Sequence, residues 1–199
     1  MAAESLASIP VDGGRIAYRC VGVGPPLLVL NGFAATSADW DPAFIHGVAS
    51  SNELILLDHS EIGNSTDDGK PFDITQLADD AAHAMETLGF DRMSMLGWSI
   101  GGFVAQTLAL QHPGRVNKLV LLSTDPGGAD ADRISATVWS QLVDTSGTPR
   151  EQARRLLYML FPSDIAELAV EEFGHIARKK QEQQPASLLA RRAGCIHEL

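Results

Sequence analysis

Cysteine, positive charge and long apolar runs are all scarce in this chain of 199 residues. Its two cysteines, Cys20 and Cys195, stand in no metal-binding or redox spacing, so a disulfide-rich domain is excluded and a reduced, cytoplasmic setting is expected. Lys and Arg number 15 against 25 Asp and Glu, and the net charge of −10 argues against nucleic acid or an anionic membrane as a partner. Every apolar run is shorter than the roughly 18 residues that a membrane span needs.

The overall composition is that of a globular protein. Hydrophobic residues make up 45% and charged residues 20% of the chain, which excludes disordered and fibrous classes. The length suits one domain with a sizeable core. His, Cys and carboxylate residues form no cluster with ligand spacing, so neither a metal nor an organic cofactor is implied.

Short apolar runs alternate with helical patterns between residues 27 and 123. Each run suits a strand that is covered on both faces, and the runs occupy residues 27–30, 53–57, 93–96 and 118–123. Helical spacing predicts helices over residues 39–50, 74–88 and 100–111. This alternation predicts an α/β fold with a mostly parallel sheet flanked by helices, which a hairpin of residues 6–9 and 15–21 extends at one edge.

The pattern changes after residue 125, where the breaker Asp125-Pro126-Gly127-Gly128 is followed by helical patterns alone. We therefore expect a core over residues 1–128 and a helical cap or lid over residues 129–199. Because no strand is predicted after Ser123, the sheet is expected to be incomplete. Residues 118–123 would then form an exposed edge, through which the chain would self-associate.

The motif Gly97-Trp98-Ser99-Ile100-Gly101-Gly102 carries the clearest chemical signal. An apolar strand precedes it and an amphipathic helix follows, which is the context that G-x-S-x-G requires. So tight a turn forces a strained backbone on Ser99, and side chains at positions 97 and 101 would collide. The turn presents the Ser99 hydroxyl at the carboxyl edge of the sheet, beside the N-terminal amides of the following helix.

With this motif, the chain resembles the α/β-hydrolase superfamily in its esterase-like branch. The resemblance also rests on four further segments: Gly24 to Phe33, Asp58 to Ser65, His112 to Val116 and Leu119 to Leu122. It covers residues 14 to 128 well and the cap only loosely. The motifs are specific for the fold and poorly specific for a substrate.

The resemblance implies a role for several residues. Ser99 would be the catalytic nucleophile, and the backbone amides of Phe33 and Ile100 would form the oxyanion hole. Gly32 and Trp98 would line the substrate pocket, although Trp98 could equally belong to the core. The chain departs from the family at Asn31, where His is usual.

The loop after Asp58 departs from the family as well. Ser60 and Glu61 stand where the family usually has Arg and Gly. Since that arginine normally braces the oxyanion loop, we expect the loop to be held differently here.

The general base is the missing part of the predicted site. The family order is Ser, then Asp or Glu, then His, with the histidine after the last strand, so the chain resembles the first two-thirds of a hydrolase. Each of its six histidines reads better as a structural or surface residue. Asp125 follows the fourth strand, where some relatives keep the triad acid, but Asp is also favoured in a turn before Pro126.

Two functions therefore remain open. The first is a serine hydrolase acting on carboxylic esters or related acyl compounds, with this chain as a fragment that lacks the C-terminal histidine. The second is a non-catalytic protein that binds a small molecule, or an inactive remnant of the same fold. A third interpretation is that the chain is half of a split enzyme, which another polypeptide completes.

Overall fold

The computed structural model describes residues 5–33, 35–66, 73–128, 131 and 134–170. The chain divides into two compact units, the first running to Ala131 and the second beginning at Asp132. The first unit holds the sheet and the second is helical in its described part.

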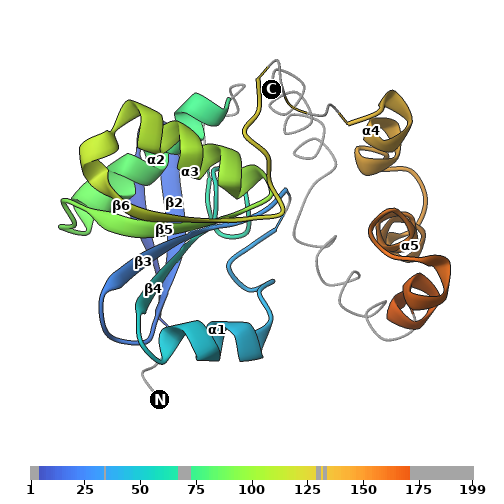
Figure 1. The fold of residues 1–199 in the computed structure, drawn as a ribbon, viewed down its shortest axis with the longest axis horizontal. Coiled ribbons are helices and arrows are strands. Elements are labelled where there is room, and N and C mark those ends of the chain that lie inside the picture. Colours follow the sequence, from blue (N-terminus) through green and yellow to red (C-terminus); the bar gives the residue numbers. More distant parts are fainter. Residues whose placement is uncertain (1–4, 34, 67–72, 129–130, 132–133, 171–199) are drawn as a thin grey trace. The chain divides into compact units, whose positions relative to one another are not determined.

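The first unit is built on one six-stranded sheet, whose strands lie in the order β1-β2-β4-β3-β5-β6 (Figure 1). Strands β3 to β6 are parallel, and the antiparallel hairpin β1–β2 joins them at β4. The strands are β1 (Ser5–Val11), β2 (Gly14–Val21), β3 (Pro26–Leu30), β4 (Glu53–Leu57), β5 (Met93–Trp98) and β6 (Val116–Leu122). The predicted α/β class, the mostly parallel sheet and the hairpin at its edge are confirmed.

Helices cover both faces of this sheet, as Figure 1 shows. Helix α1 (Pro42–Ala49) packs on one face through Ile45. Helices α2 (Ile74–Thr87) and α3 (Ile100–Gln111) pack on the other face, where the larger apolar core lies. A short 3-10 helix, η1 (Pro113–Arg115), leads from α3 into β6.

Side-chain caps fix the start of two of these helices. Asp41 accepts a hydrogen bond from the Phe44 amide, and Asp73 accepts one from the Gln76 amide, each at 2.8 Å. Such caps satisfy amides that the first helical turn leaves without a partner. Because Asp41 caps α1, this helix begins three residues later than the sequence predicts, with Pro42 at its first position.

Strand β6 forms one edge of the sheet and is far more exposed than its apolar sequence suggests. Leu119, Val120 and Leu121 are 37%, 45% and 41% exposed, whereas Leu54 in β4 is fully buried. Within the described residues, β6 pairs with β5 on one side only. The exposed edge was predicted, while the burial expected from the apolar run itself is wrong.

The regular elements in the described residues of the second unit are all helices. It contains α4 (Ala136–Leu142), α5 (Pro149–Leu160) and a further helical stretch over residues 163–170. Thr148 and Glu151 form a reciprocal capping box at the start of α5. None of the described helices of either unit is long and apolar enough to cross a membrane.

Candidate active site

The turn between β5 and α3 holds Ser99 in a conformation that few residues other than glycine adopt. Its backbone angles are φ 54° and ψ −119°. The Ser99 amide donates to the Leu122 carbonyl at 2.9 Å, and the Ser99 carbonyl accepts from the Gly102 amide at 2.8 Å. These bonds to β6 and to α3 hold a strained backbone of the kind that recurs at functional sites.

Two glycines make this turn sterically feasible. A Cβ on Gly97 would lie 2.7 Å from the Gly102 Cα, and one on Gly101 would lie 2.7 Å from the Asn31 carbonyl oxygen. Real Cβ atoms essentially never approach so closely. The first turn of α3 therefore rests directly on the end of β3, because position 101 carries no side chain.

Strain in the described residues is concentrated at one edge of the sheet. The non-glycine residues with positive φ are Glu61, Ser99 and Ser123, at 62°, 54° and 48°. They follow the carboxyl ends of β4, β5 and β6, respectively. Open α/β sheets bind their ligands at this edge, so strain and topology indicate the same region.

The predicted oxyanion residues come from two elements that meet at this edge. Ile100 is the first residue of α3, and the amides of a first helical turn have no partner within the helix. Phe33 is half-buried and lies three residues after Leu30, which pairs with Gly97 between β3 and β5. Ser99 is half-buried too. Phe33 thus follows the end of β3, while Ser99 and Ile100 lie where β5 ends and α3 begins. The catalytic roles of these three residues stay predictions.

The predicted pocket residues Gly32 and Trp98 are in contact. A Cβ on Gly32 would lie 2.9 Å from the indole ring of Trp98, so the ring covers the backbone of the loop after β3. Trp98 is 38% exposed and meets the Trp40 ring edge-on, with 5.8 Å between centroids. Trp98 is therefore a partly exposed wall beside Ser99 and not a fully buried core residue.

Asp125 lies on an exposed turn. Its carboxylate accepts a hydrogen bond from the Gly127 amide at 2.7 Å, and its carbonyl accepts one from the Gln106 side chain at 2.9 Å. This is the turn geometry that Asp favours before Pro-Gly. The contacts account for Asp125 structurally, and its role as the triad acid stays a prediction.

Asp58 supports the loop after β3. Its buried carboxylate accepts a hydrogen bond from the Ser37 amide at 2.5 Å. Burial raises the pKa of the Asp58 carboxyl above its ordinary value, and the hydrogen bonds from Ser37 and Asn64 oppose this rise. The Asp58 carboxylate therefore braces the loop after β3 through the Ser37 amide.

A pH effect follows from the raised pKa of Asp58. The folded state binds this proton more tightly than the unfolded state, so the free energy of unfolding falls as the pH rises above about 4 through the folded pKa. Asp58→Asn removes this fall while keeping an oxygen that can accept from Ser37. Urea unfolding of both proteins between about pH 4 and pH 7 measures the two slopes. Equal slopes would contradict this account of Asp58.

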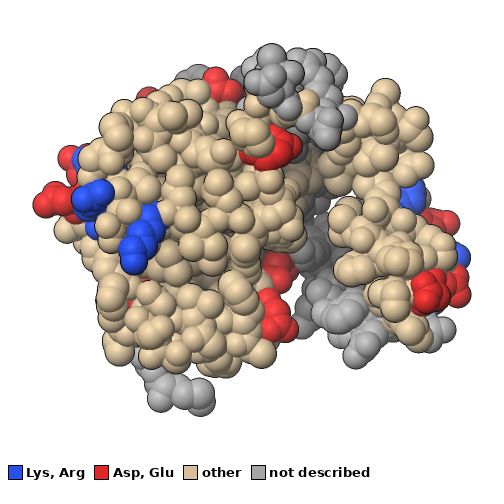
Figure 2. All heavy atoms as spheres, viewed as in Figure 1, with Lys and Arg blue, Asp and Glu red and all other residues tan. Residues whose placement is uncertain are grey.

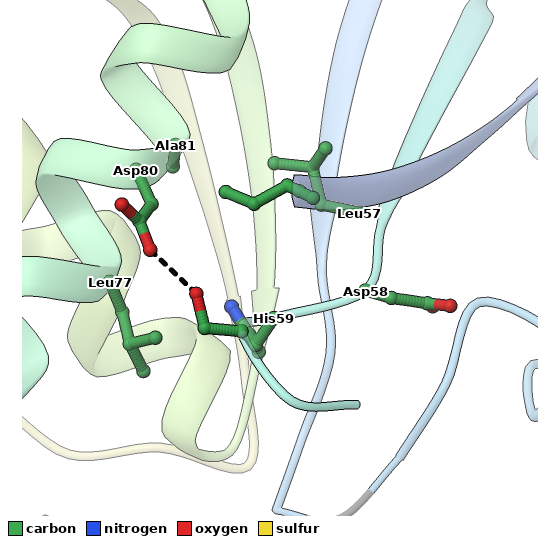
Figure 3. Close-up of a pocket in the computed structure, with 8 residues that line it drawn as sticks. Leu57, Asp58, His59, Leu77, Asp80 and Ala81 are labelled. Carbon is green, nitrogen blue, oxygen red and sulfur yellow. Dashed lines mark hydrogen bonds between the residues drawn. The ribbon is translucent and has the colours of Figure 1, made fainter. Parts of the chain in front are cut away.

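The small pocket in Figure 3 lies between the loop after β4 and α2, and two of its lining residues, Ser60 and Asp80, bind each other. Asp80 accepts hydrogen bonds from the Ser60 hydroxyl at 2.8 Å and from the Gln76 side-chain Nε2 at 3.0 Å. In Figure 3 the Asp58 carboxylate points away from Asp80. These bonds tie the loop to α2 and give the pocket a structural role.

The described histidines do not lie in the setting expected of a catalytic base. The His59 ring is buried, with its Nε2 3.2 Å from the Asn31 carbonyl oxygen. His83 Nε2 lies 3.0 Å from the Pro10 carbonyl oxygen, and His112 Nε2 lies 3.5 Å from an Asp79 oxygen. His46 is exposed on α1. His175 and His197 lie outside the described residues.

In the part of the chain that the structure describes, no group of three or more His, Cys, Asp or Glu residues could hold a metal ion.

Comparison with known proteins identifies the family. Residues 25–157 match the family model of the alpha/beta hydrolase fold. A provisionally named carbamate hydrolase from Azorhizobium caulinodans is 31% identical over 153 residues, which cover 75% of this chain and 56% of that protein. A pimeloyl-[acyl-carrier protein] methyl ester esterase from Aeromonas hydrophila is 33% identical over 106 residues, or 53% of this chain and 40% of that protein.

A solved structure extends the likeness to the fold. The crystal structure of a hydrolase from Pseudomonas aeruginosa PA01 matches with a TM-score of 0.78 and 26% identity, covering 97% of this chain and 72% of that one. The chain spans about half the length of the curated relatives named above, and those relatives are hydrolases. By its sequence and by its sheet, the chain belongs to the α/β-hydrolase fold family.

Proposed function

We propose that this chain carries the nucleophile and the oxyanion hole of a serine hydrolase acting on carboxylic esters or related acyl compounds. The observation that carries the proposal is the positive φ of Ser99 between a buried strand and a helix N-terminus. A methyl ester esterase among the relatives supports ester chemistry. A serine at this position favours acyl transfer, because its hydroxyl can form an ester with the substrate.

The proposed reaction has two steps. The Ser99 oxygen attacks the carbonyl carbon and loses its proton to a base, while the carbonyl electron pair moves onto oxygen beside the amides of Phe33 and Ile100. That pair returns, the C–O bond of the ester breaks, and the departing alcohol takes up the proton. Water then attacks the acyl-Ser99 ester in the same way, releasing the acid and restoring the serine.

The general base of this reaction is not assigned to any described histidine. His59, His83 and His112 each have a ring nitrogen close to a carbonyl or carboxylate oxygen. We therefore place the base outside the described residues, and keep Asp125 as a candidate for the acid that orients it. A cytoplasmic setting stays part of the proposal, supported by only two cysteines in the chain.

The competing function is binding of a small apolar molecule without turnover. It is favoured by the absence of a suitably placed imidazole among the described residues and by the half-exposed ring of Trp98. A fluorophosphonate probe separates the two functions, because it forms a covalent bond only with an activated serine. In the form of the protein that holds the general base, we expect one probe per chain, mapped to Ser99 by peptide mass spectrometry. A chain that binds esters and is never labelled would support binding alone.

We also propose that the chain self-associates through the β6 edge. The outer backbone groups of β6 and the exposed Val120 side chain form a surface on which another strand can pair. Val120→Lys places a charge on that edge and is expected to lower the apparent mass in light scattering towards that of a monomer. Leu110→Lys, at a residue of α3 that is 83% exposed, is the control and should change nothing. A wild-type monomer at high concentration would contradict the proposal.

A further inference from the structure

Asn31 is fully buried at the end of β3 and binds through both ends of its side-chain amide. Its Nδ2 donates to the Leu57 carbonyl at 2.5 Å, and its Oδ1 accepts from Trp40 Nε1 at 2.6 Å. An indole nitrogen only donates and a carbonyl only accepts, so these partners fix the orientation of the amide. Asn31 thereby ties the end of β3 to the end of β4 and to Trp40, in front of α1.

Trp40 connects this anchor to the turn that carries Ser99. Besides its hydrogen bond to Asn31, its ring meets the ring of Trp98 edge-on, with 5.8 Å between centroids and 63° between planes. Trp98 directly precedes Ser99, and its ring covers Gly32. Asn31 therefore contacts Trp40, Trp40 contacts Trp98, and Trp98 contacts Gly32, which is the next residue after Asn31.

In the sequence, Phe33 directly follows Gly32, the last member of this set of contacts. The first turn of α3 also packs against Asn31, because a Cβ on Gly101 would lie 2.7 Å from the Asn31 carbonyl oxygen. The two candidate oxyanion donors, the amides of Phe33 and Ile100, are thus held on elements that meet at Asn31. A shift of Asn31 or Trp40 would change the spacing between these donors and Ser99.

From these contacts we infer that Asn31 and Trp40 are positioning residues, which set the Phe33 amide at the distance from Ser99 that the oxyanion requires. This inference rests on the proposed function. Neither side chain needs to touch the substrate. Because the amides contribute most when charge develops on the carbonyl oxygen, losing their alignment slows the covalent step and leaves initial binding unchanged.

Two variants test this role by kinetics. Trp40→Phe keeps a ring and removes the N–H that Asn31 accepts, and Asn31→Asp turns a carboxylate oxygen towards the Leu57 carbonyl. With a fluorophosphonate probe, we expect the maximal rate of labelling to fall about tenfold for Trp40→Phe and about a hundredfold for Asn31→Asp. The probe concentration at half-maximal rate should stay within about twofold of the wild-type value in both, since positioning acts on the covalent step.

The chain offers a matched control at Asn52. This asparagine also donates to a backbone carbonyl, that of Val48 at 2.9 Å, but it precedes β4 at the opposite edge of the sheet. Asn52→Asp should keep the wild-type labelling rate. Thermal unfolding of all three variants verifies that each is folded. Folded Asn31→Asp and Trp40→Phe proteins that label at the wild-type rate would overturn the inference.

A second measurement distinguishes failure of this inference from failure of the proposed function. In ¹H–¹⁵N spectra, Asn31→Asp and Trp40→Phe should shift the amide signals of Phe33 and Ile100 and leave that of Ala82 in α2 in place. If the wild type is never labelled, the proposed function fails and these signals alone decide the positioning role. Unmoved Phe33 and Ile100 signals would then overturn that role too.

Discussion

Ser99→Ala is expected to remove ester hydrolysis almost entirely, in the form of the protein that holds the general base. Replacing a serine nucleophile typically lowers kcat by about 10⁴-fold to 10⁶-fold, because no covalent intermediate can form. Ester binding should persist, since the wall formed by Trp98 and the loop after β3 do not depend on the hydroxyl. The measurement is kcat for a chromogenic short-chain ester, together with the affinity for a non-hydrolysable analogue.

Ser123→Ala is the matched control for this experiment. Among the residues that the structure describes, Ser123 is the other serine with positive φ, and it follows β6 where Ser99 follows β5. If strain alone marked the nucleophile, the two serines would be equivalent, but only Ser99 is followed directly by the first turn of a helix. We therefore expect Ser123→Ala to keep most of the activity. Full activity of Ser99→Ala would exclude the proposed mechanism.

Gly101→Ala, which adds a single methyl group, is expected to lower the free energy of unfolding strongly. The added Cβ would collide with the Leu30 carbonyl oxygen and lie 2.7 Å from that of Asn31. Both are backbone atoms at the end of a central strand, so neither can move without disturbing β3. Overpacking of this kind costs about 3 kcal/mol, a large share of the 5–15 kcal/mol that holds a typical domain folded.

Gly47→Ala is the control for this stability measurement. Gly47 also lies in a helix, and a Cβ there would meet nothing within 4 Å. Replacing an exposed helical glycine by alanine stabilises by up to about 1 kcal/mol. Urea denaturation should thus show opposite signs for the two Gly→Ala changes. Equal midpoints would contradict the close approach of α3 to β3.

Much of the first unit could be predicted from the sequence because its signals are local. The apolar run of β4 and the helical spacing of α3 predicted both elements with their observed bounds, Glu53–Leu57 and Ile100–Gln111. The G-x-S-x-G motif predicted the strained turn at Ser99, because the cause of the strain is steric and lies within the five residues of the motif. Parallel order followed from the alternation of strands and helices.

The features that sequence reasoning missed depend on contacts between distant segments. The hydrogen bond from Trp40 to Asn31 joins two loops, and that from Asn31 to Leu57 joins two strand ends. Nothing local in the sequence distinguishes Asn31 from a turn residue. A signal was nevertheless present, because Asn31 stands where the family usually has histidine, and a replacement beside the oxyanion loop needs new partners.

The environment of β6 was predicted only in part for a related reason. An apolar run indicates that both faces of a strand are covered, but it does not show which segments cover them. The side chains of β6 suit a strand within a sheet, while Leu119 and Leu121 are more than a third exposed in the described chain. The apolar side chains of β6 are thus more exposed than their residue types suggest.

The central claim is that Ser99 attacks a carbonyl whose developing charge faces the amides of Phe33 and Ile100. A crystal structure of the protein after reaction with a fluorophosphonate tests it most directly. We expect phosphorus bonded to the Ser99 Oγ and the phosphoryl oxygen within about 3 Å of both amide nitrogens. An adduct on another residue, or a phosphoryl oxygen turned away from both amides, would contradict the account.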